Sequence, residues 1–98
     1  MTKEEILSIL AEIKPELAAK FHIRELGLFG SFALGTATES SDVDIFYRTE
    51  DGFTVDLFEE IGLQKRLRRR FKRKTDFMHY ERLNPIVQYR AQQHAIYV

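Results

Sequence analysis

The chain has 98 residues, and 44% of them are hydrophobic, including eight Phe and four Tyr. A chain of this length and composition can bury one modest core, so we expect a single domain over residues 1–98. The formal net charge is zero, and the lack of cysteine excludes a disulfide framework and a thiolate zinc site. No apolar run approaches the roughly twenty residues of a membrane span, and Met1–Glu5 lacks the features of a signal peptide, so we expect a cytoplasmic protein that does not enter a membrane.

The first predicted element is a helix over residues 2–20. Thr2 and Glu5 have the spacing of a capping box, in which each side chain bonds the backbone N–H of the other residue. Apolar side chains then recur at helical spacing at Ile6, Leu10, Ile13 and Leu17. Pro15 removes an N–H and crowds the preceding turn, so we expect a kink or a break into two helical pieces near Lys14.

A strand is predicted over residues 21–29, and a second over Val43–Tyr47, where apolar and polar residues alternate. Between them, Gly30 permits a tight turn and a close approach of a ligand to the backbone. Ser31 lies where a short helix would begin, and the free N–H groups of that helix would face an anion. Residues 36–41 are small and polar, which predicts a loop. This succession of elements therefore predicts a phosphate-binding turn.

Two carboxylates follow that turn. Because side chains alternate along a strand, Asp42 and Asp44 project from one face, while Val43 and Ile45 project from the other face into a core. Carboxylates so close together repel each other, and a hard divalent cation is the usual compensation. Asp42 and Asp44 are therefore candidate metal ligands beside Gly30.

Asp51-Gly52 predicts a turn before a second amphipathic helix. The helix is predicted from apolar residues at Phe53, Leu57, Ile61, Leu67 and Phe71, with Gly62 as a weak point. Its end is basic: eight of the ten residues Lys65–Lys74 are Lys or Arg. This basic run could contact nucleic acid, an acidic partner or nucleotide phosphates, or it could be a solvated helix end, where the macrodipole favours cations.

A third strand is predicted over Thr75–Met78, with Asp76 as its only acidic residue. A lone aspartate on a strand is commonly an edge residue in contact with water.

Asn84-Pro85 predicts the start of a closing helix, with Asn84 as N-cap and Pro85 at the first helical position. The apolar tail Ala95–Val98 is expected to pack on the domain or on a partner.

The three histidines are too scattered for metal-ligand spacing. We expect His22 and His94 to be surface or partly buried imidazoles, and we assign no catalytic role to His79.

Two of these motifs together carry a resemblance to a known family. The stretch Leu28–Gly35, followed by Ser41–Ile45, resembles the signature of the DNA polymerase beta-like nucleotidyltransferase superfamily. The short chain is similar to its smallest branch, the minimal nucleotidyltransferases, and nearly all of its elements correspond. The resemblance implies an α/β (α+β) fold with a small mixed β-sheet flanked by helices. Leu34 is a departure, because many relatives have arginine at that position.

The resemblance also implies a reaction. A hydroxyl would attack the α-phosphate of a nucleoside triphosphate, ATP or another, and pyrophosphate would leave. Gly30 and Ser31 would bind the nucleotide. The catalytic and metal-binding carboxylates would be Asp42, Asp44 and Asp76, holding Mg²⁺ as two ions, with Asp76 near the attacking oxygen and able to accept its proton.

The partner implied by the resemblance is an all-helical ribonuclease toxin of the HEPN type. This chain would then be its antitoxin, which transfers AMP to a tyrosine of the toxin. Four apolar side chains could serve the interface, or could instead be ordinary core residues: Phe53, Phe58, Ile96 and Tyr97.

Two alternatives stay open. A catalytically silent antitoxin would act by binding alone; Leu34 in place of arginine favours it, and the three aspartates oppose it. A nucleic-acid-binding module would use the basic run 65–74, but the sequence has no recognisable reading motif. The nucleotide, the acceptor and the oligomeric state are also open at this point.

Overall fold

The computed structural model describes all 98 residues and contains one four-stranded sheet in the order β3-β2-β1-β4. The strands are β1 (Ile23–Phe29), β2 (Val43–Thr49), β3 (Thr75–His79) and β4 (Ile96–Tyr97). β1 pairs antiparallel with β2 and β4, whereas β2 pairs parallel with β3. The predicted small mixed sheet is confirmed.

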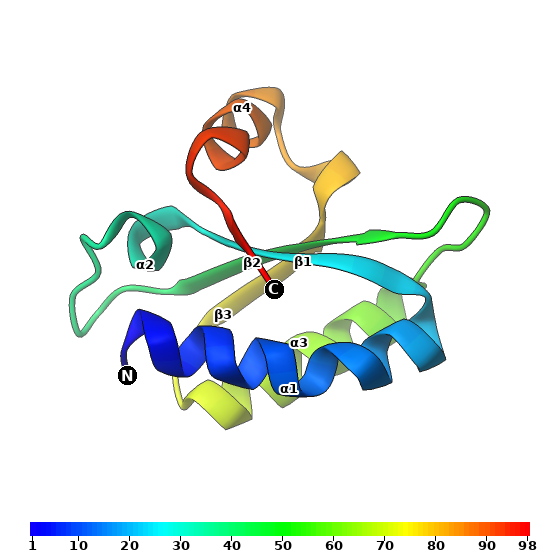
Figure 1. Cartoon of the computed structure of the whole chain (residues 1–98), viewed down its shortest axis with the longest axis horizontal. Coiled ribbons are helices and arrows are strands. Elements are labelled where there is room, and N and C mark those ends of the chain that lie inside the picture. Colours follow the sequence, from blue (N-terminus) through cyan, green and yellow to red (C-terminus); the bar gives the residue numbers. More distant parts are fainter.

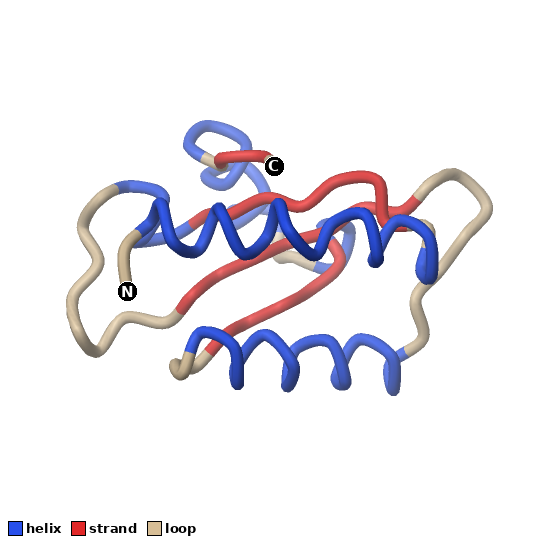
Figure 2. The backbone as a smooth tube through the Cα atoms, turned by 60° about the horizontal axis from the view of Figure 1, so that its bottom comes forward, coloured by secondary structure: helices blue, strands red, loops and turns tan.

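Helices cover both faces of the sheet. α1 (Lys3–Phe21) and α3 (Leu57–Phe71) lie on one face, and α4 (Pro85–His94) lies on the other (Figure 1). The short α2 (Gly30–Leu34) follows β1 at one end of the sheet, and a 3₁₀ turn η1 (Tyr80–Arg82) connects β3 to α4. Figure 2 shows α1 and α3 together on their face with α4 behind the sheet. No helix is both long and apolar enough to cross a membrane.

The two faces of the sheet have separate buried clusters. The larger cluster fills the space between the sheet and α1 and α3, and includes Leu10, Leu17, Leu26, Ile45, Leu67 and Phe77. The smaller one lies under α4 and consists of Phe46, Tyr80 and Ala91. Because strand residues alternate, Val43 and Ile45 face the larger cluster, and the opposite face of β2 carries Asp44 and Phe46.

α1 confirms the predicted capping box, with Thr2 and Glu5 bonded reciprocally. The predicted break near Lys14 is wrong, because one helix runs from Lys3 to Phe21 through Pro15. Pro15 is exposed, as is Ala11, whose carbonyl would otherwise accept the missing N–H bond. Water can satisfy that carbonyl on the solvent side, so the helix need not end there.

α3 differs from its prediction in both its start and its buried stripe. It begins at Leu57 because Asp56 and Glu59 form a second capping box. The buried residues are Glu60, Leu63, Leu67 and Phe71. The predicted apolar positions Phe53, Leu57 and Ile61 are exposed instead. A charged residue, Glu60, therefore occupies the stripe that the sequence pattern assigned to apolar side chains.

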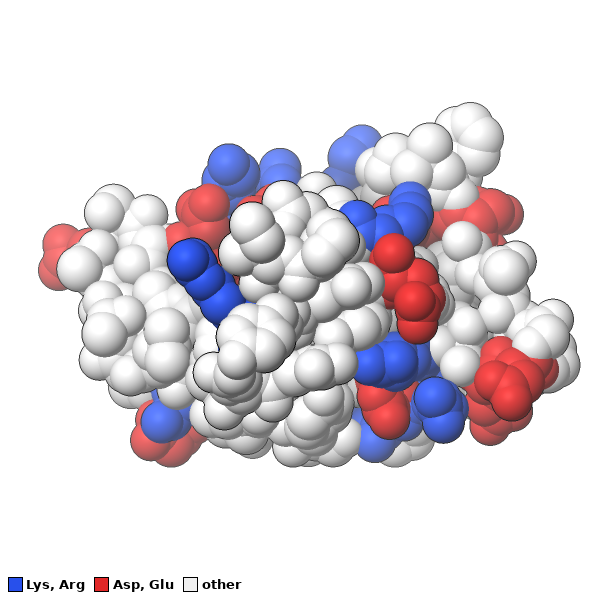
Figure 3. Space-filling view, turned by 90° about the horizontal axis from the view of Figure 1, so that it is seen from above, with Lys and Arg blue, Asp and Glu red and all other residues white.

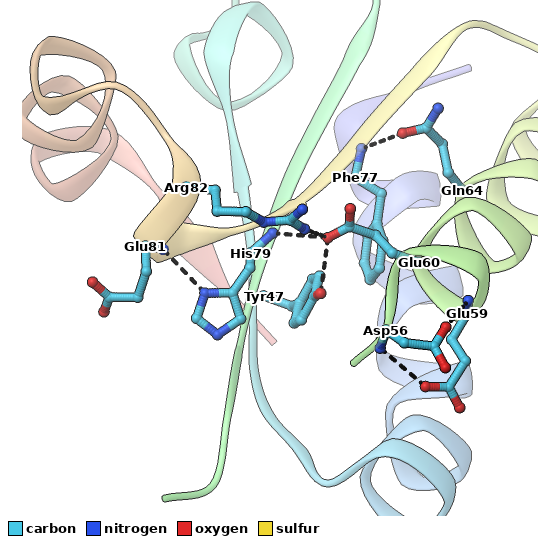
Figure 4. A network of polar contacts seen from close by, with 9 residues as sticks. All are labelled: Tyr47, Asp56, Glu59, Glu60, Gln64, Phe77, His79, Glu81 and Arg82. Carbon is cyan, nitrogen blue, oxygen red and sulfur yellow. Dashed lines mark hydrogen bonds and ion pairs between the residues drawn. The ribbon is translucent and has the colours of Figure 1, made fainter. Parts of the chain in front are cut away.

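A polar network explains the burial of Glu60 (Figure 4). Glu60 is only 6% exposed, and its carboxylate accepts from Tyr47 Oη at 2.8 Å, from the His79 N–H at 3.3 Å and from the Arg82 guanidinium. Burial, and then the Glu60 carboxylate, raise the pKa of Tyr47 above its ordinary range. A buried carboxylate is tolerated only where donors surround it. The network fixes the end of β3 and η1 against α3.

The C-terminal segment confirms two predictions. Asn84 caps α4, accepting from the N–H groups of Ile86 and Val87. The apolar tail packs on the sheet: Ile96 and Tyr97 pair with β1, and the Val98 carbonyl oxygen accepts from Lys14 Nζ at 2.5 Å. The C-terminal end of α4 is thereby connected to the sheet through the pairing of the tail with β1.

Much of the basic run is engaged within the chain. Arg66 makes a two-bond ion pair with Glu16, at 2.6 and 2.8 Å, and Arg70 pairs with Glu12. The Arg66 hydrogen bonds, partly opposed by desolvation, lower the pKa of Glu16 to about 2. Arg68 donates to the Thr75 carbonyl. These contacts connect α3 to α1 and β3. A helix end that is merely solvated would not make them, so this part of the basic run has a structural role.

Candidate active site

The sheet register places two of the predicted carboxylates side by side. Asp44 of β2 is paired with Asp76 of β3, and Phe29 of β1 is paired with Asp44 on its other side. Phe29, Asp44 and Asp76 therefore form one row across three neighbouring strands. The lone aspartate of the third strand lies beside the Asp-x-Asp motif, as the resemblance implied.

Charge is concentrated on this row. Burial, followed by the charges of Asp76 and Asp42, raises the pKa of Asp44 to about 6, and Lys74 opposes the shift. Lys74 Nζ lies 3.7 Å from Asp42 Oδ2. No three His, Cys, Asp or Glu side chains are gathered closely enough to hold a metal ion by themselves. Asp44 and Asp76 thus form a close pair of carboxylates, and Asp42 lies at its margin against a lysine.

Gly30 lies directly against this pair. Its φ is +72°, in the left-handed region that favours glycine, and an added Cβ would lie 2.3 Å from Asp44 Oδ2. The Asp44 carboxylate therefore occupies the position that a side chain at residue 30 would take, so the turn packs against this carboxylate only with glycine in place. Ser31, the next residue, is partly buried, and its hydroxyl has no hydrogen-bond partner within the chain. Leu34, at the end of α2, is 57% exposed and contributes no charge.

His94 is a residue of this region that the sequence analysis did not assign. The Gly30 N–H donates to His94 Nε2 at 3.0 Å, across 64 residues of sequence. A backbone N–H can only donate, so the His94 ring nitrogen is the acceptor of this bond. His94 is the last residue of α4, so this bond connects the glycine turn to the closing helix. No local sequence pattern could have indicated a contact over such a separation. His22 and His79 lie elsewhere: His22 stacks on Phe53, and His79 accepts from the Glu81 N–H.

Arg73 orders the loop that precedes Asp42. Its guanidinium donates to the carbonyl oxygens of Thr38, Glu39 and Ser41, at 3.1, 3.1 and 2.8 Å. It also lies over the Phe32 ring, 5.1 Å from the centroid. This arginine of the basic run therefore positions the Asp-x-Asp segment, a role that the charge pattern did not indicate.

A pocket of about 350 Å³ opens beside the two carboxylates. Its lining residues are Phe29, Asp44, Ile45, Asp76, Met78, Leu83 and Val87. Apart from the two aspartates, all of them are apolar. The arrangement combines a glycine turn, a carboxylate pair and an adjoining apolar cavity.

The sequence profile of the family described as "Polymerase beta, Nucleotidyltransferase" matches residues 11–98. The protein adenylyltransferase MntA of Thermococcus cleftensis is 51% identical over 51 residues, which are 52% of each chain. The chain thus matches about half the length of that relative. A Methanocaldococcus jannaschii protein, provisionally named a protein adenylyltransferase, is 32% identical over 98 residues, which cover 99% of this chain and 98% of the relative.

Solved structures are similar over the whole chain. One, provisionally described as a minimal nucleotidyltransferase, has a TM-score of 0.76 at 26% identity, and covers 98% of this chain and 95% of that chain. A chain from a toxin-antitoxin crystal structure with AMP-PNP has a TM-score of 0.72 at 20% identity, over 99% of this chain and 72% of that chain.

A third structure contains a tri-AMPylated Shewanella oneidensis HEPN toxin in complex with an MNT antitoxin. Its matching chain has a TM-score of 0.63 at 17% identity, over 97% of this chain and 66% of that chain. At such identities these last two likenesses show the fold alone. Because the family profile covers most of the sequence and a relative of nearly equal extent is 32% identical, the chain belongs to the polymerase beta nucleotidyltransferase family and has the fold of its minimal members.

Proposed function

We propose that this protein transfers AMP from ATP to a tyrosine hydroxyl of a HEPN-type toxin, and so acts as its antitoxin. The observation that carries the proposal is the pairing of Asp44 with Asp76 directly beside the glycine turn at Gly30. The names of the relatives support protein adenylylation, and the neighbouring toxin-antitoxin structures support a toxin partner. The cytoplasmic location and the single domain expected from the sequence stay predictions.

The carboxylates suit magnesium as the metal. Mg²⁺ is commonly held by one or two carboxylates together with substrate phosphates and water, so a ready-made set of three protein ligands is not required. Asp44 and Asp76 offer oxygen ligands side by side. The pKa of Asp44 is raised by burial and then by the like charges of Asp76 and Asp42, and a cation would offset that repulsion. Asp42, Asp44 and Asp76 would hold two ions, which when bound supply charge neutralisation at the phosphates and activation of the hydroxyl.

The residues of the chain have separate tasks in the proposed reaction. The Gly30 turn and the Ser31 hydroxyl bind the triphosphate. Asp76, at the exposed end of the carboxylate row, receives the proton of the attacking hydroxyl. The hydroxyl oxygen forms a bond to the α-phosphorus, the bond from that phosphorus to the bridging oxygen breaks, and pyrophosphate leaves. Most of the catalytic effect would come from positioning and charge, as in other phosphoryl-type transfers.

Exposed apolar side chains offer a surface for the toxin. Phe58 is 85% exposed, and Phe53 and Tyr97 are also exposed, whereas Ile96 is partly buried in β4. Of the four side chains expected at such an interface, Ile96 is therefore the least available.

The nucleic-acid alternative receives less support from the structure than from the sequence. Five of the eight cations in the basic run have partners within the chain, namely Arg66, Arg68, Arg70, Arg73 and Lys74. Lys65, Arg69 and Lys72 have none, and three cations would give only weak, salt-sensitive binding.

Mass spectrometry of a co-expressed toxin tests the proposal and distinguishes it from a silent antitoxin. Wild-type protein should add the mass of AMP to the toxin and protect the cells. Asp76→Asn should lower the extent of modification by about a hundredfold and remove protection, because the carboxylate that receives the proton is lost. Wild-type protein and Asp76→Asn should both form the complex with the toxin. Full protection by Asp76→Asn, with no nucleotide on the toxin in either case, would instead establish inhibition by binding alone.

His94 should contribute to nucleotide binding through the Gly30 turn. His94→Ala removes the acceptor of the Gly30 N–H, so we expect KM for ATP to rise by a factor of roughly 2 to 10, the value of one hydrogen bond, with kcat nearly unchanged. His94→Gln should restore KM, because an amide oxygen can accept the same N–H. A His94→Ala variant with unchanged KM, or a His94→Gln variant as weak as His94→Ala, would contradict this role. Steady-state kinetics at a fixed acceptor concentration provide the measurement.

A further inference from the structure

The apolar pocket beside Asp44 and Asp76 is lined by four separate parts of the chain, one of which is β2 with Asp44 and Ile45. Met78 lies two residues after Asp76 on β3, so both side chains project from the same face of the sheet. Phe29 comes from the end of β1. Leu83 and Val87 come from the connection to α4 and from its first turns. The carboxylates thus lie at one side of a cavity that is otherwise apolar.

The α4 side of the pocket is held in place by several hydrogen bonds. Asn84 Oδ1 accepts from the Val87 N–H at 3.3 Å. Gln88 Nε2 donates to the Tyr80 carbonyl at 2.9 Å, and Tyr80 Oη donates to the Gln88 carbonyl at 3.3 Å. The Gln88–Tyr80 bonds hold α4 against η1, which follows β3 directly, so the segment that carries Leu83 and Val87 is fixed at both ends.

The proposed reaction could bring a nucleobase, an aliphatic hydroxyl or a phenol to this pocket, and the apolar lining suits these three groups to different degrees. A nucleobase has donors and acceptors around its edge, and most of them would lose their partners against this wall. A serine or threonine hydroxyl would leave the apolar surface unfilled. A phenol combines an apolar ring with one polar end, and its hydroxyl would face the carboxylates while the ring covers the wall. Methionine is well suited to such a contact, because its thioether packs favourably against aromatic rings.

We infer that this pocket receives the aromatic ring of the acceptor, and that Met78, Leu83 and Val87 make the enzyme prefer a phenolic hydroxyl to an aliphatic one. The inference rests on the proposed nucleotidyl transfer and adds the residues that choose the acceptor. The phenolic oxygen bonds to the α-phosphorus, pyrophosphate leaves, and the phenolic proton passes to Asp76. Met78 is 38% exposed, so a side chain of another protein can reach it. The face of the molecule seen from the α4 side has little charge at its centre, which suits an uncharged segment of an acceptor (Figure 3).

The test supplies the 98-residue protein with ATP, Mg²⁺ and one of two small acceptors, N-acetyltyrosinamide or N-acetylserinamide. Pyrophosphate release and the nucleotide adduct are measured together. Wild-type protein should use the tyrosine compound with a kcat/KM at least about tenfold above that of the serine compound. Val87→Ser should raise KM for N-acetyltyrosinamide about tenfold and leave KM for ATP unchanged. Met78→Ser should also raise KM for N-acetyltyrosinamide. Because Met78 is more exposed than Val87, this second variant keeps the test valid if Val87→Ser fails to fold.

Ile86→Ser is the matched control. Ile86 precedes Val87 on α4, is 64% exposed and does not line the pocket, so its variant should behave as wild type. Equal use of the two acceptors by wild type, or pocket variants that keep KM for N-acetyltyrosinamide, would overturn the inference. If the pocket variants raise KM for ATP instead, the cavity binds the nucleobase and the inference is wrong. If wild type releases pyrophosphate with no acceptor at all, the proposed transfer itself has failed.

Discussion

Asp44→Asn should abolish nucleotidyl transfer and, without metal, raise the melting temperature of the protein. Asp44 lies between Asp42 and Asp76, and burial together with these charges raises its pKa to about 6. At neutral pH the folded protein therefore holds an ionised carboxylate in an unfavourable environment, and the asparagine removes that cost. The same substitution removes a ligand from the proposed magnesium site, so transfer should fall by about a thousandfold or more.

The pH dependence of the melting temperature provides an independent measurement. The pKa of Asp44 is higher in the folded protein than its ordinary value of 3.8, so the folded state binds this proton more tightly than the unfolded state. The stabilisation from that proton is complete below about pH 4 and is lost as the pH rises through about 6. Wild type should therefore melt below Asp44→Asn at pH 7 in EDTA, and the difference should disappear near pH 4.

Asp42→Asn is the control for this experiment. Asp42 lies 3.7 Å from Lys74 and at the margin of the carboxylate pair, so its variant should gain less stability than Asp44→Asn. Mg²⁺ with ATP should stabilise wild type and have a smaller effect on both variants. If wild type and Asp44→Asn melt together at every pH, and Mg²⁺ has no effect on either, these carboxylates do not form a metal site.

The parts of the fold that the sequence predicted well are those with local causes. The capping box at Thr2, the N-cap at Asn84 and the alternation along Val43–Tyr47 each depend on residues within a few positions of one another. That Asp76 lies beside Asp44 was predicted from the family resemblance alone. Strand alternation predicts which face of the sheet a side chain is on, but it does not predict which strands are neighbours.

The errors have physical causes that lie far apart in the sequence. The predicted apolar pattern of α3 left out Glu60, and its burial is tolerable because donors on Tyr47, His79 and Arg82 surround its carboxylate. The stripe of α3 was consequently assigned to Leu57 and Ile61. The bond between His94 and Gly30 also depends on the return of the chain over the sheet after α4, which no periodicity predicts. Pro15 was expected to kink α1 or break it into two pieces, and its exposed position explains why the helix does not break.

Gly30→Ala should inactivate the protein, whereas Gly35→Ala should leave activity close to wild type. Both glycines have positive φ, at +72° and +78°, so each substitution brings a left-handed strain of about 1 to 2 kcal/mol. They differ in their surroundings: an added Cβ at Gly30 would lie 2.3 Å from Asp44 Oδ2, and one at Gly35 would meet no atom within 4 Å. Alanine at Gly30 must therefore move the Asp44 carboxylate or the turn. A displacement of about 1 Å at such a site costs on the order of a hundredfold in rate. Valine at Gly30, which is larger, should also prevent binding of ATP.

The cause of the Gly30 effect can be isolated by a double-mutant cycle on stability. If the clash is with the Asp44 side chain, Gly30→Ala should cost less in a background that already carries Asp44→Ala, because the obstructing carboxylate is gone. The remaining cost should approach that of Gly35→Ala, which reports the backbone strain alone. Chemical unfolding of the four proteins of the cycle and of Gly35→Ala gives these free energies. Additive costs would show that Gly30 and Asp44 do not interact, and wild-type transfer by Gly30→Ala would remove the glycine turn from the active site.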